Sequence, residues 1–368
     1  MTKQHNKKPD REDRAVGTVM GRVTIQNIAD QLGISKFAVS RALSGKAGVS
    51  EPKRRLIVET AALLGYDAKS RGRKSAKGDK VEVIFRDRST ASRELWVDVQ
   101  NGIDQEAAAK GYGVSVRWLE DPDELLRVES NAIGYIFVGP HPASVLDAAL
   151  RSALPAVVVN HIVPPLWPKD QISAADVEAG VFVAHYLKSL GHRRVVYTHG
   201  RLGYPGRLAR LAGFADAIAE AADMELREIA FSDDQAAGDL REAVMAMATS
   251  GFEPTAFFCG SDTVAVTVVS ELMRMGLRVP EDVSVVGHAD YAIATRISPQ
   301  LTTVHMPHRE MGVAAVRVLL ARGGRSPLMD GLPPQRINLV PNLVERQSSG
   351  PATRESWRHR LRGLATPT

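Results

Sequence analysis

The sequence predicts a small all-α segment followed by an α/β core of two doubly wound lobes. Three observations support this: short amphipathic helical patterns occupy residues 23–66, strand and helix patterns alternate from Val81 onward, and the two regions differ in charge. With 368 residues, 44% of them apolar, the chain is long enough to bury more than one core. The composition therefore excludes a disordered or fibrous protein.

The charge is concentrated at the N-terminal end. Residues 1–80 carry 18 Lys and Arg against 8 Asp and Glu, whereas the whole chain has a net charge of only +5. Such local positive charge indicates a polyanionic partner, either nucleic acid or an anionic membrane surface. The sequence has no apolar run long enough for a membrane span and no signal-peptide pattern. We therefore expect a cytoplasmic protein. The single cysteine, Cys259, lies in an apolar run and is expected to be a buried, inert thiol.

Each of the three helical patterns follows a plausible N-cap residue, namely Thr24, Ser35 and Ser50. Only Gly33, Ile34 and Ser35 separate the first two helices. A short glycine turn of this kind is typical of a helix-turn-helix, although ordinary helical hairpins have it too. In the third helix we expect Leu56, Ile57, Ala61 and Leu64 to point inward.

The second helix has an unusual outer face. If Ala38, Val39, Ala42 and Leu43 pack inward, the outward residues are Lys36, Phe37, Ser40, Arg41 and Ser44. An exposed Phe beside Lys and Arg is a poor solvated surface. It suits a DNA major groove, where Arg pairs with guanine edges and an apolar group contacts the thymine methyl.

Residues 67–80 form a basic stretch with six Lys and Arg and two glycines. This stretch is either a solvated linker or a linker that also contacts phosphates. Beyond it, eight β-branched runs alternate with Ala- and Leu-rich helical stretches, the pattern of parallel sheets covered by helices. The predicted strands are 81–85, 114–118, 132–139, 156–160, 193–200, 227–231, 255–260 and 283–287.

The string VTIQNIADQLGISKFAVSRALSGKAGVSEPKRRLIVETAALLGY resembles the helix-turn-helix headpiece of the LacI/GalR family of bacterial transcription regulators. The resemblance continues through SLGHRRVVYTHG, RLAGFADAI, FFCGSDTVA, GLRVPEDVSVVGHAD and SPQLTTVHMP, and covers about residues 23–348. It implies a headpiece joined to a periplasmic-binding-protein-like core, in which two Rossmann-like lobes are connected by three crossing strands.

The resemblance also divides the chain into domains. We expect a flexible basic arm at 1–22, the headpiece at 23–66, the linker at 67–80, a core at 81–345 and a tail at 346–368. The predicted N-lobe comprises about 81–161 plus 307–323, and the predicted C-lobe about 162–306 plus 330–345.

Position by position, the resemblance implies that Lys36, Phe37 and Arg41 read bases. Phosphate contacts are expected from Thr24, Ser35, Ser40, Ser50, Tyr66, Arg71, Arg73 and Lys74. This division agrees with the helix-face analysis, since phosphate contacts position a protein whereas base contacts specify sequence. Ser35 and Ser50 have the alternative of being N-caps only.

For a ligand cleft between the lobes, the resemblance points to five residues. They are Trp96, Asp176, Arg210, Phe231 and Asp262. Planar charged groups and aromatic faces suit a sugar-like effector. Alternatively, Trp96 and Phe231 belong to the core, and the two aspartates cap the helices that follow them.

Three positions depart from the family pattern. GHAD replaces the usual GFDD or GYDD, so that Ala289 stands where the first acid is expected. Ser75 stands where many members carry a leucine that wedges into the minor groove, which favours an electrostatic link over a hinge helix. The stretch LEDPDELLRVESN is about ten residues shorter than usual.

The sequence thus predicts a DNA-binding regulator, most simply a repressor. We expect it to act as a homodimer on a near-palindromic operator and to respond to a small effector. No cofactor, metal site or catalytic group is expected. The alternatives are a cytosolic solute-binding protein and an NAD-type Rossmann enzyme. The glycines at 200, 203 and 206 have the wrong spacing for a dinucleotide fingerprint, however.

Overall fold

The computed structural model forms two compact units, residues 1–76 and 77–368. It describes residues 25–43, 48–63, 79–86, 94–119, 121, 131–160, 163, 166–200, 205–231, 236–325 and 331–361. The predicted arm at 1–22 and the residues Thr24, Ser44, Tyr66, Arg71, Arg73, Lys74 and Ser75 lie outside the described residues, as does most of the shortened stretch after Leu119.

The first unit contains the three predicted helices, α1 (Ile25–Leu32), α2 (Lys36–Leu43) and α3 (Glu51–Leu63). Their apolar faces meet in one small core, in which Ile28, Val39 and Ile57 are fully buried. The prediction that Leu56 points inward was wrong, because its side chain is 51% exposed. Ile57 and Ala61, which were also predicted to point inward, are both buried.

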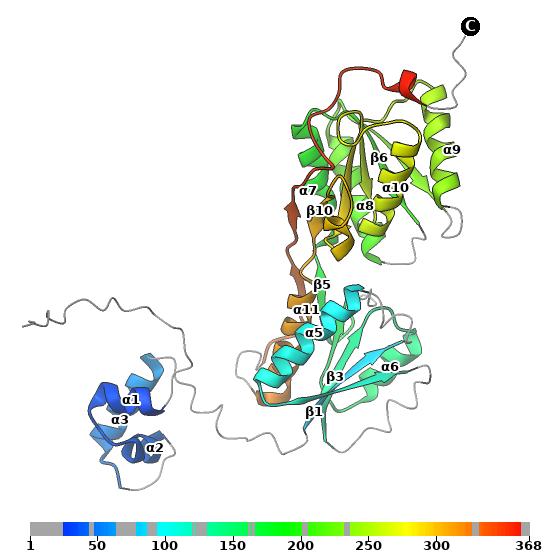
Figure 1. Cartoon of the computed structure of the whole chain (residues 1–368). Coiled ribbons are helices and arrows are strands. Elements are labelled where there is room, and N and C mark those ends of the chain that lie inside the picture. Colours follow the sequence, from blue (N-terminus) through cyan, green and yellow to red (C-terminus); the bar gives the residue numbers. More distant parts are fainter. Residues whose placement is uncertain are drawn as a thin grey trace, which may run out of the picture. The chain divides into compact units, whose positions relative to one another are not determined.

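The second unit contains two six-stranded sheets flanked by helices (Figure 1). All neighbouring strands of the first sheet are parallel, in the order β11-β5-β4-β3-β1-β2. Its strands are β1 (Lys80–Phe85), β2 (Gly113–Trp118), β3 (Ala132–Val138), β4 (Ala156–Val159), β5 (Asp170–Ala174) and β11 (Arg336–Leu339). The helices of this lobe are α5 (Glu94–Ala109), α6 (Ala143–Arg151) and α11 (His308–Leu320).

The second sheet has the order β12-β10-β9-β8-β6-β7, in which only β12 is antiparallel to its neighbour. Its strands are β6 (Arg194–His199), β7 (Glu225–Ala230), β8 (Ala256–Cys259), β9 (Ser284–Ala289), β10 (Thr302–His305) and β12 (Asn342–Val344). The helices of this lobe are α7 (Asp176–Ser189), α8 (Pro205–Glu220), α9 (Ala236–Thr249) and α10 (Asp262–Arg274). The short helices are η3 (Ala292–Thr295), η4 (Ala321–Arg325) and η6 (Arg358–Arg360).

Alternate residues of the inner strands face opposite sides of the second sheet. Val195 and Phe258 enter one core, whereas Val196 and Cys259 enter another. Strands covered on both faces read as continuous apolar runs, which is why the sequence revealed them. Cys259 is fully buried, as predicted, and burial raises the pKa of its thiol well above the usual value.

The predicted lobe boundaries need correction. Residues 162–306 and 330–345 were assigned to the second lobe, but β5 and β11 pair in parallel within the first sheet. The chain therefore crosses between lobes after Ala174, between β10 and α11, and between β11 and β12.

The predicted tail at 346–368 was also wrong over its described part. Ser348 is fully buried and Trp357 is 1% exposed, within the core of the second lobe. The Trp357 indole donates a hydrogen bond to the Pro254 carbonyl at 3.0 Å. An aromatic ring of this size stabilises the lobe through the apolar area that it buries.

Helices α7 and α8 pack at very short range because both carry glycine at the contact. A Cβ at Gly180 would overlap with the backbone oxygen of Arg210, and one at Gly213 would overlap with that of Val177. This close packing sets the position of Arg210 relative to the start of α7.

We predict that Gly180→Ala destabilises the second lobe by about 1–3 kcal/mol, because overpacking forces the two helices apart. Chemical denaturation followed by circular dichroism measures this change. Gly238→Ala in α9 is the matched control, since a Cβ there meets nothing within 4 Å. The control should be neutral or slightly stabilising. Equal behaviour of the two variants would contradict the packing argument.

Candidate ligand cleft and DNA-reading surface

The exposed face of α2 brings together the three predicted base readers. Lys36 and Phe37 are exposed, and the Phe37 ring is 69% accessible. The Arg41 guanidinium carbon lies 5.4 Å from the Phe37 ring centroid. On its other side, Arg41 runs along Gly48, where an added Cβ would lie 3.3 Å from Nε. Arg41 is therefore held along the helix surface by an aromatic ring and a bare backbone.

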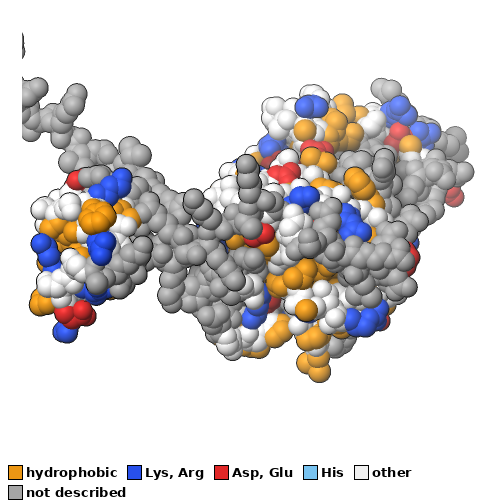
Figure 2. Space-filling view, turned by 90° about the horizontal axis from the view of Figure 1, so that it is seen from below, with side chains coloured by type: hydrophobic (Ala, Val, Ile, Leu, Met, Phe, Trp, Pro, Cys, Tyr) orange, Lys and Arg blue, Asp and Glu red, His pale blue; other side chains and the backbone are white. Residues whose placement is uncertain are grey.

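Figure 2 shows basic and hydrophobic side chains next to one another on this unit. Ser35 is the N-cap of α2, since its Oγ accepts a hydrogen bond from the Ala38 amide at 3.2 Å. At α3 the Ser50 carbonyl accepts the Arg54 amide at 2.9 Å. Ser35, Ser40 and Ser50 are all exposed, and their contacts to phosphate remain a prediction.

A cavity of about 100 Å³ lies within the second unit, at the carboxyl ends of parallel strands from both sheets. In sheets of this kind the ligand site forms where strands end and helices begin. Three of the five predicted cleft residues line this cavity: Trp96 from α5, Asp176 from α7 and Arg210 from α8.

Arg210 is the most constrained of these residues. Its side chain is 8% exposed, and Nη1 forms a short hydrogen-bonded ion pair with Asp176 Oδ1. Nη2 donates to the Gly260 carbonyl at 3.0 Å, whereas Nε is buried with no hydrogen-bond partner among the described residues. Burial alone would lower the pKa of Arg210, but the charge of Asp176, the neighbouring Tyr197 and the hydrogen bonds to both residues together outweigh burial and raise the pKa. The guanidinium therefore stays charged with one donor unused.

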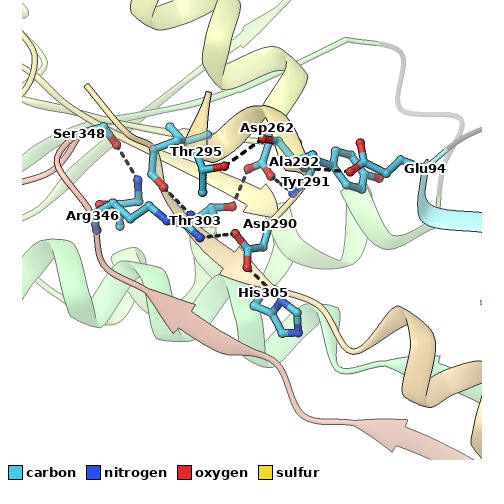
Figure 3. Close-up of polar contacts among 12 residues, drawn as sticks. Glu94, Asp262, Asp290, Tyr291, Ala292, Thr295, Thr303, His305, Arg346 and Ser348 are labelled. Atoms are coloured by element: carbon cyan, nitrogen blue, oxygen red, sulfur yellow. Dashed lines mark hydrogen bonds and ion pairs between the residues drawn. The ribbon is translucent and has the colours of Figure 1, made fainter. Parts of the chain in front are cut away.

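Asp262 does not line the cavity, so its assignment as an effector ligand is corrected. It is fully buried and accepts hydrogen bonds from Thr303 Oγ1 at 2.5 Å and the Tyr291 amide at 2.6 Å (Figure 3). Nor does it cap α10, because Ser261 is the N-cap. Its carboxylate instead ties the start of α10 to β10 and to the segment after β9.

Phe231 is the second correction. It is absent from the described cavity wall and packs, half-buried, against the apolar core of the second lobe. Its backbone amide donates to the His199 carbonyl at 3.2 Å. The alternative of a core residue therefore holds for Phe231. Trp96 is buried as well, but it also lines the cavity.

The cavity wall also includes residues that were not predicted from the sequence, among them His288, Tyr291 and His308, which have titratable side chains. Burial lowers the pKa of His288 well below its usual value, and that of His308 to about 3. Burial raises the pKa of Tyr291 to about 12. All three are therefore uncharged at neutral pH. The Tyr291 and His308 rings stack with centroids 6.4 Å apart, and both residues line the cavity.

Asp290, the acid that remains in GHAD, contacts residues next to the crossing strands rather than lining the cavity. Its Oδ1 accepts from Arg346 Nη2 at 2.7 Å, and its Oδ2 lies 3.1 Å from His305 Nδ1 (Figure 3). Next to it, the Ala292 amide donates to Glu94 Oε1 at 2.8 Å. This last contact joins the two lobes directly, because Glu94 begins α5 of the first lobe.

Within the described part of the chain, no three His, Cys, Asp or Glu side chains gather as metal ligands would. The helices in that part are all too short or too polar to cross a bilayer.

The buried Asp262 predicts a pH-dependent stability. Burial raises the pKa of its carboxyl from 3.8 to about 6, so the folded state binds the proton more tightly than the unfolded state. The loss of unfolding free energy that comes from ionising the buried carboxyl is absent below pH 3.8 and complete above pH 6. Relative to Asp262→Asn, the wild type should lose about 2 kcal/mol of unfolding free energy between pH 4.5 and 7. Urea titrations at both pH values measure this difference, and a constant gap would contradict the shifted pKa.

Comparisons with known proteins agree with this architecture. A periplasmic-binding-protein-like domain matches residues 184–349. The transcriptional regulator reg1 of Streptomyces lividans is 30% identical over 91% of this chain and 99% of its own length. The transcriptional repressor PurR of Aliivibrio salmonicida is 26% identical over 88% of this chain and 98% of its own.

Two solved structures share the fold. The complex of the transcriptional regulator CelR with cellobiose is 22% identical and has a TM-score of 0.62, covering 89% of this chain and all of that one. The lac repressor dimer bound to operator and the anti-inducer ONPF has the same identity and TM-score over 90% of this chain and all of that one. Given the helix-turn-helix unit, the two-lobed core with its cleft and the full-length relatives, the chain belongs to the LacI/GalR family of transcriptional regulators.

Proposed function

We propose that this protein represses transcription by binding an operator through α2, and that a small molecule in the cleft changes its affinity for DNA. The observation that carries this proposal is the combination, in one chain, of an exposed reading face on α2 and a cleft with unused buried donors. A solute-binding protein has no need of the first feature. Relatives named as transcriptional regulators also support a binding role over catalysis.

On the operator, Lys36, Phe37 and Arg41 read base edges, while the helix N-terminus at Ser35 approaches a phosphate. Ser40 and Ser50 add phosphate contacts. Thr24, Tyr66, Arg71, Arg73 and Lys74, which lie outside the described residues, complete the phosphate set. The excess positive charge of residues 1–80 then supplies affinity that does not depend on sequence.

A homodimer on a near-palindromic operator is part of the proposal, because one headpiece reads too few base pairs for a unique site. The fold is shared with a lac repressor that was solved as a dimer on its operator. Such a regulator works in the bacterial cytoplasm, where the chromosome lies.

Effector control follows from the crossing strands. A ligand that contacts Trp96 in one lobe and Arg210 in the other favours a particular lobe closure, and this preference is a coupling free energy between the cleft and the DNA. The contact between Glu94 and the Ala292 amide already bridges the lobes without a ligand.

We predict that Arg41→Ala weakens binding to the natural operator by about 1–3 kcal/mol and relaxes base preference at one position of each half-site, because it removes a base contact. Gel shifts on the operator and on single-base variants measure both effects. Ser35→Ala is the comparison variant, expected to weaken all sequences alike. A uniform loss for Arg41→Ala would contradict the reading role.

Arg210→Ala should abolish the response to effector and leave operator binding intact. The measurement is operator release by compounds that raise the melting temperature of the wild type in a screen of sugars and related metabolites. Arg274→Ala is a matched control, because Arg274 is exposed and its partner Glu271 keeps the ion pair with Arg241. An unchanged response in Arg210→Ala would remove this residue from the effector site.

A further inference from the structure

The cavity wall contains buried nitrogen atoms that have no hydrogen-bond partner among the described residues. They are Trp96 Nε1, Arg210 Nε and His288 Nε2; the first two can only donate, and the role of the third depends on the tautomer of the neutral imidazole. Trp96, Arg210 and His288 are 1%, 7% and 3% exposed. They come from both lobes, since Trp96 belongs to α5 and the other two to α8 and β9. Buried polar groups of native proteins are paired, which indicates that a ligand supplies the acceptors.

Carboxylate acceptors, by contrast, are scarce in the described part of the same wall, where Asn160, Ser261 and Tyr291 provide only neutral acceptors. Asp176 is engaged by Arg210 and lies 3.7 Å from His288 Nε2. Ala289 contributes a methyl group where the family pattern has an acid. The carboxylates of Asp262 and Asp290 are used by the crossing-strand contacts described above. A ligand with only hydroxyl groups would therefore find few anionic partners here.

The cavity wall also carries more cationic than anionic side chains. Among its described residues, Arg207 and Arg210 stand against the carboxylate of Asp176. Helices α7, α8 and α11 begin at its wall, where Asp176, Gly206 and His308 lie. Helix N-termini favour anions because their amide groups and dipoles point toward the ligand. Unpaired donors, few carboxylates and three helix N-termini thus all favour the same kind of ligand.

We propose that the cleft binds a polyhydroxylated ligand of about monosaccharide size that carries a carboxylate or phosphate group. The anionic group meets the donors of Arg210 and Trp96 and the His288 imidazole in its Nε2–H tautomer, and the carbon skeleton of the ligand lies against Tyr291 and His308. This inference rests on the proposed function of the cleft as the effector site. It narrows the proposed effector to anionic molecules that are rich in hydrogen-bond acceptors.

The test uses the full chain and matched probes in isothermal titration calorimetry. The neutral probes are D-glucose and D-galactose, and each is paired with its uronic acid and its 6-phosphate; D-glucitol is paired with D-gluconate. At least one anionic probe should bind ten-fold or more tightly than its neutral parent. Binding of the acids or of the phosphates identifies which anionic group the cleft accepts. Absence of binding by every anionic probe, or equal binding of the neutral parents, would overturn the proposal.

A pair of variants isolates the charge. Ala289→Asp places an acid in the wall and should weaken the binding of the best anionic probe ten-fold or more. The neutral isostere Ala289→Asn should change the affinity for the same probe much less. Equal losses in the two variants would contradict an electrostatic preference. If neither variant folds, Arg207→Gln is measured instead. It should weaken the binding of anionic probes and leave the binding of neutral probes unchanged.

Gel shifts with the same probes separate this inference from the proposed function. A neutral sugar that releases the operator, while no anion does, would leave the regulator standing and overturn the ligand class. An anionic probe that binds the cleft without changing DNA affinity would support the ligand class and contradict effector control.

Discussion

The buried ion pair between Arg210 and Asp176 is the interaction on which the ligand cleft depends. A guanidinium this deeply buried is tolerated only with a charged partner and further acceptors, here Asp176 and the Gly260 carbonyl. Both partners sit where helices begin at the carboxyl ends of the second sheet. Arg210 can reach Asp176 only if α7 and α8 are nearly in backbone contact, and Gly180 makes this contact possible. The ion pair in the cleft therefore depends on the close packing of α7 and α8.

Much of this architecture could be predicted from local patterns. The headpiece helices have caps and a 3.6-residue apolar period, and the inner strands are continuous apolar runs. Four strands and α11 escaped detection; β5 and β10, with the sequences DQISA and TTVH, are short and polar. Their identity depends on pairing with residues far away in the chain, so no local pattern reveals them. The same reason explains why Trp357 was mistaken for part of a tail.

The cleft was predictable in part. Trp96, Asp176 and Arg210 reach the cavity, whereas Asp262 and Phe231 turn away from it, although all five residue types suit a sugar site. Position near the end of a strand or the start of a helix follows from sequence; the direction of a side chain does not. Asp262 faces Thr303, its partner from a strand that local patterns did not reveal.

GHAD departs from the family pattern at Ala289, in the cavity wall, and keeps the second acid of the motif, Asp290. Ala289 lines the cavity, and among the described residues Asp176 is the acid that lies near the neutral His288. The remaining acid of the motif, Asp290, holds Arg346 and His305. These contacts tie together segments next to the strands that cross between the lobes. Neighbouring residues of one short motif thus have different tasks, so the acid that is missing at position 289 is not the one that makes these contacts.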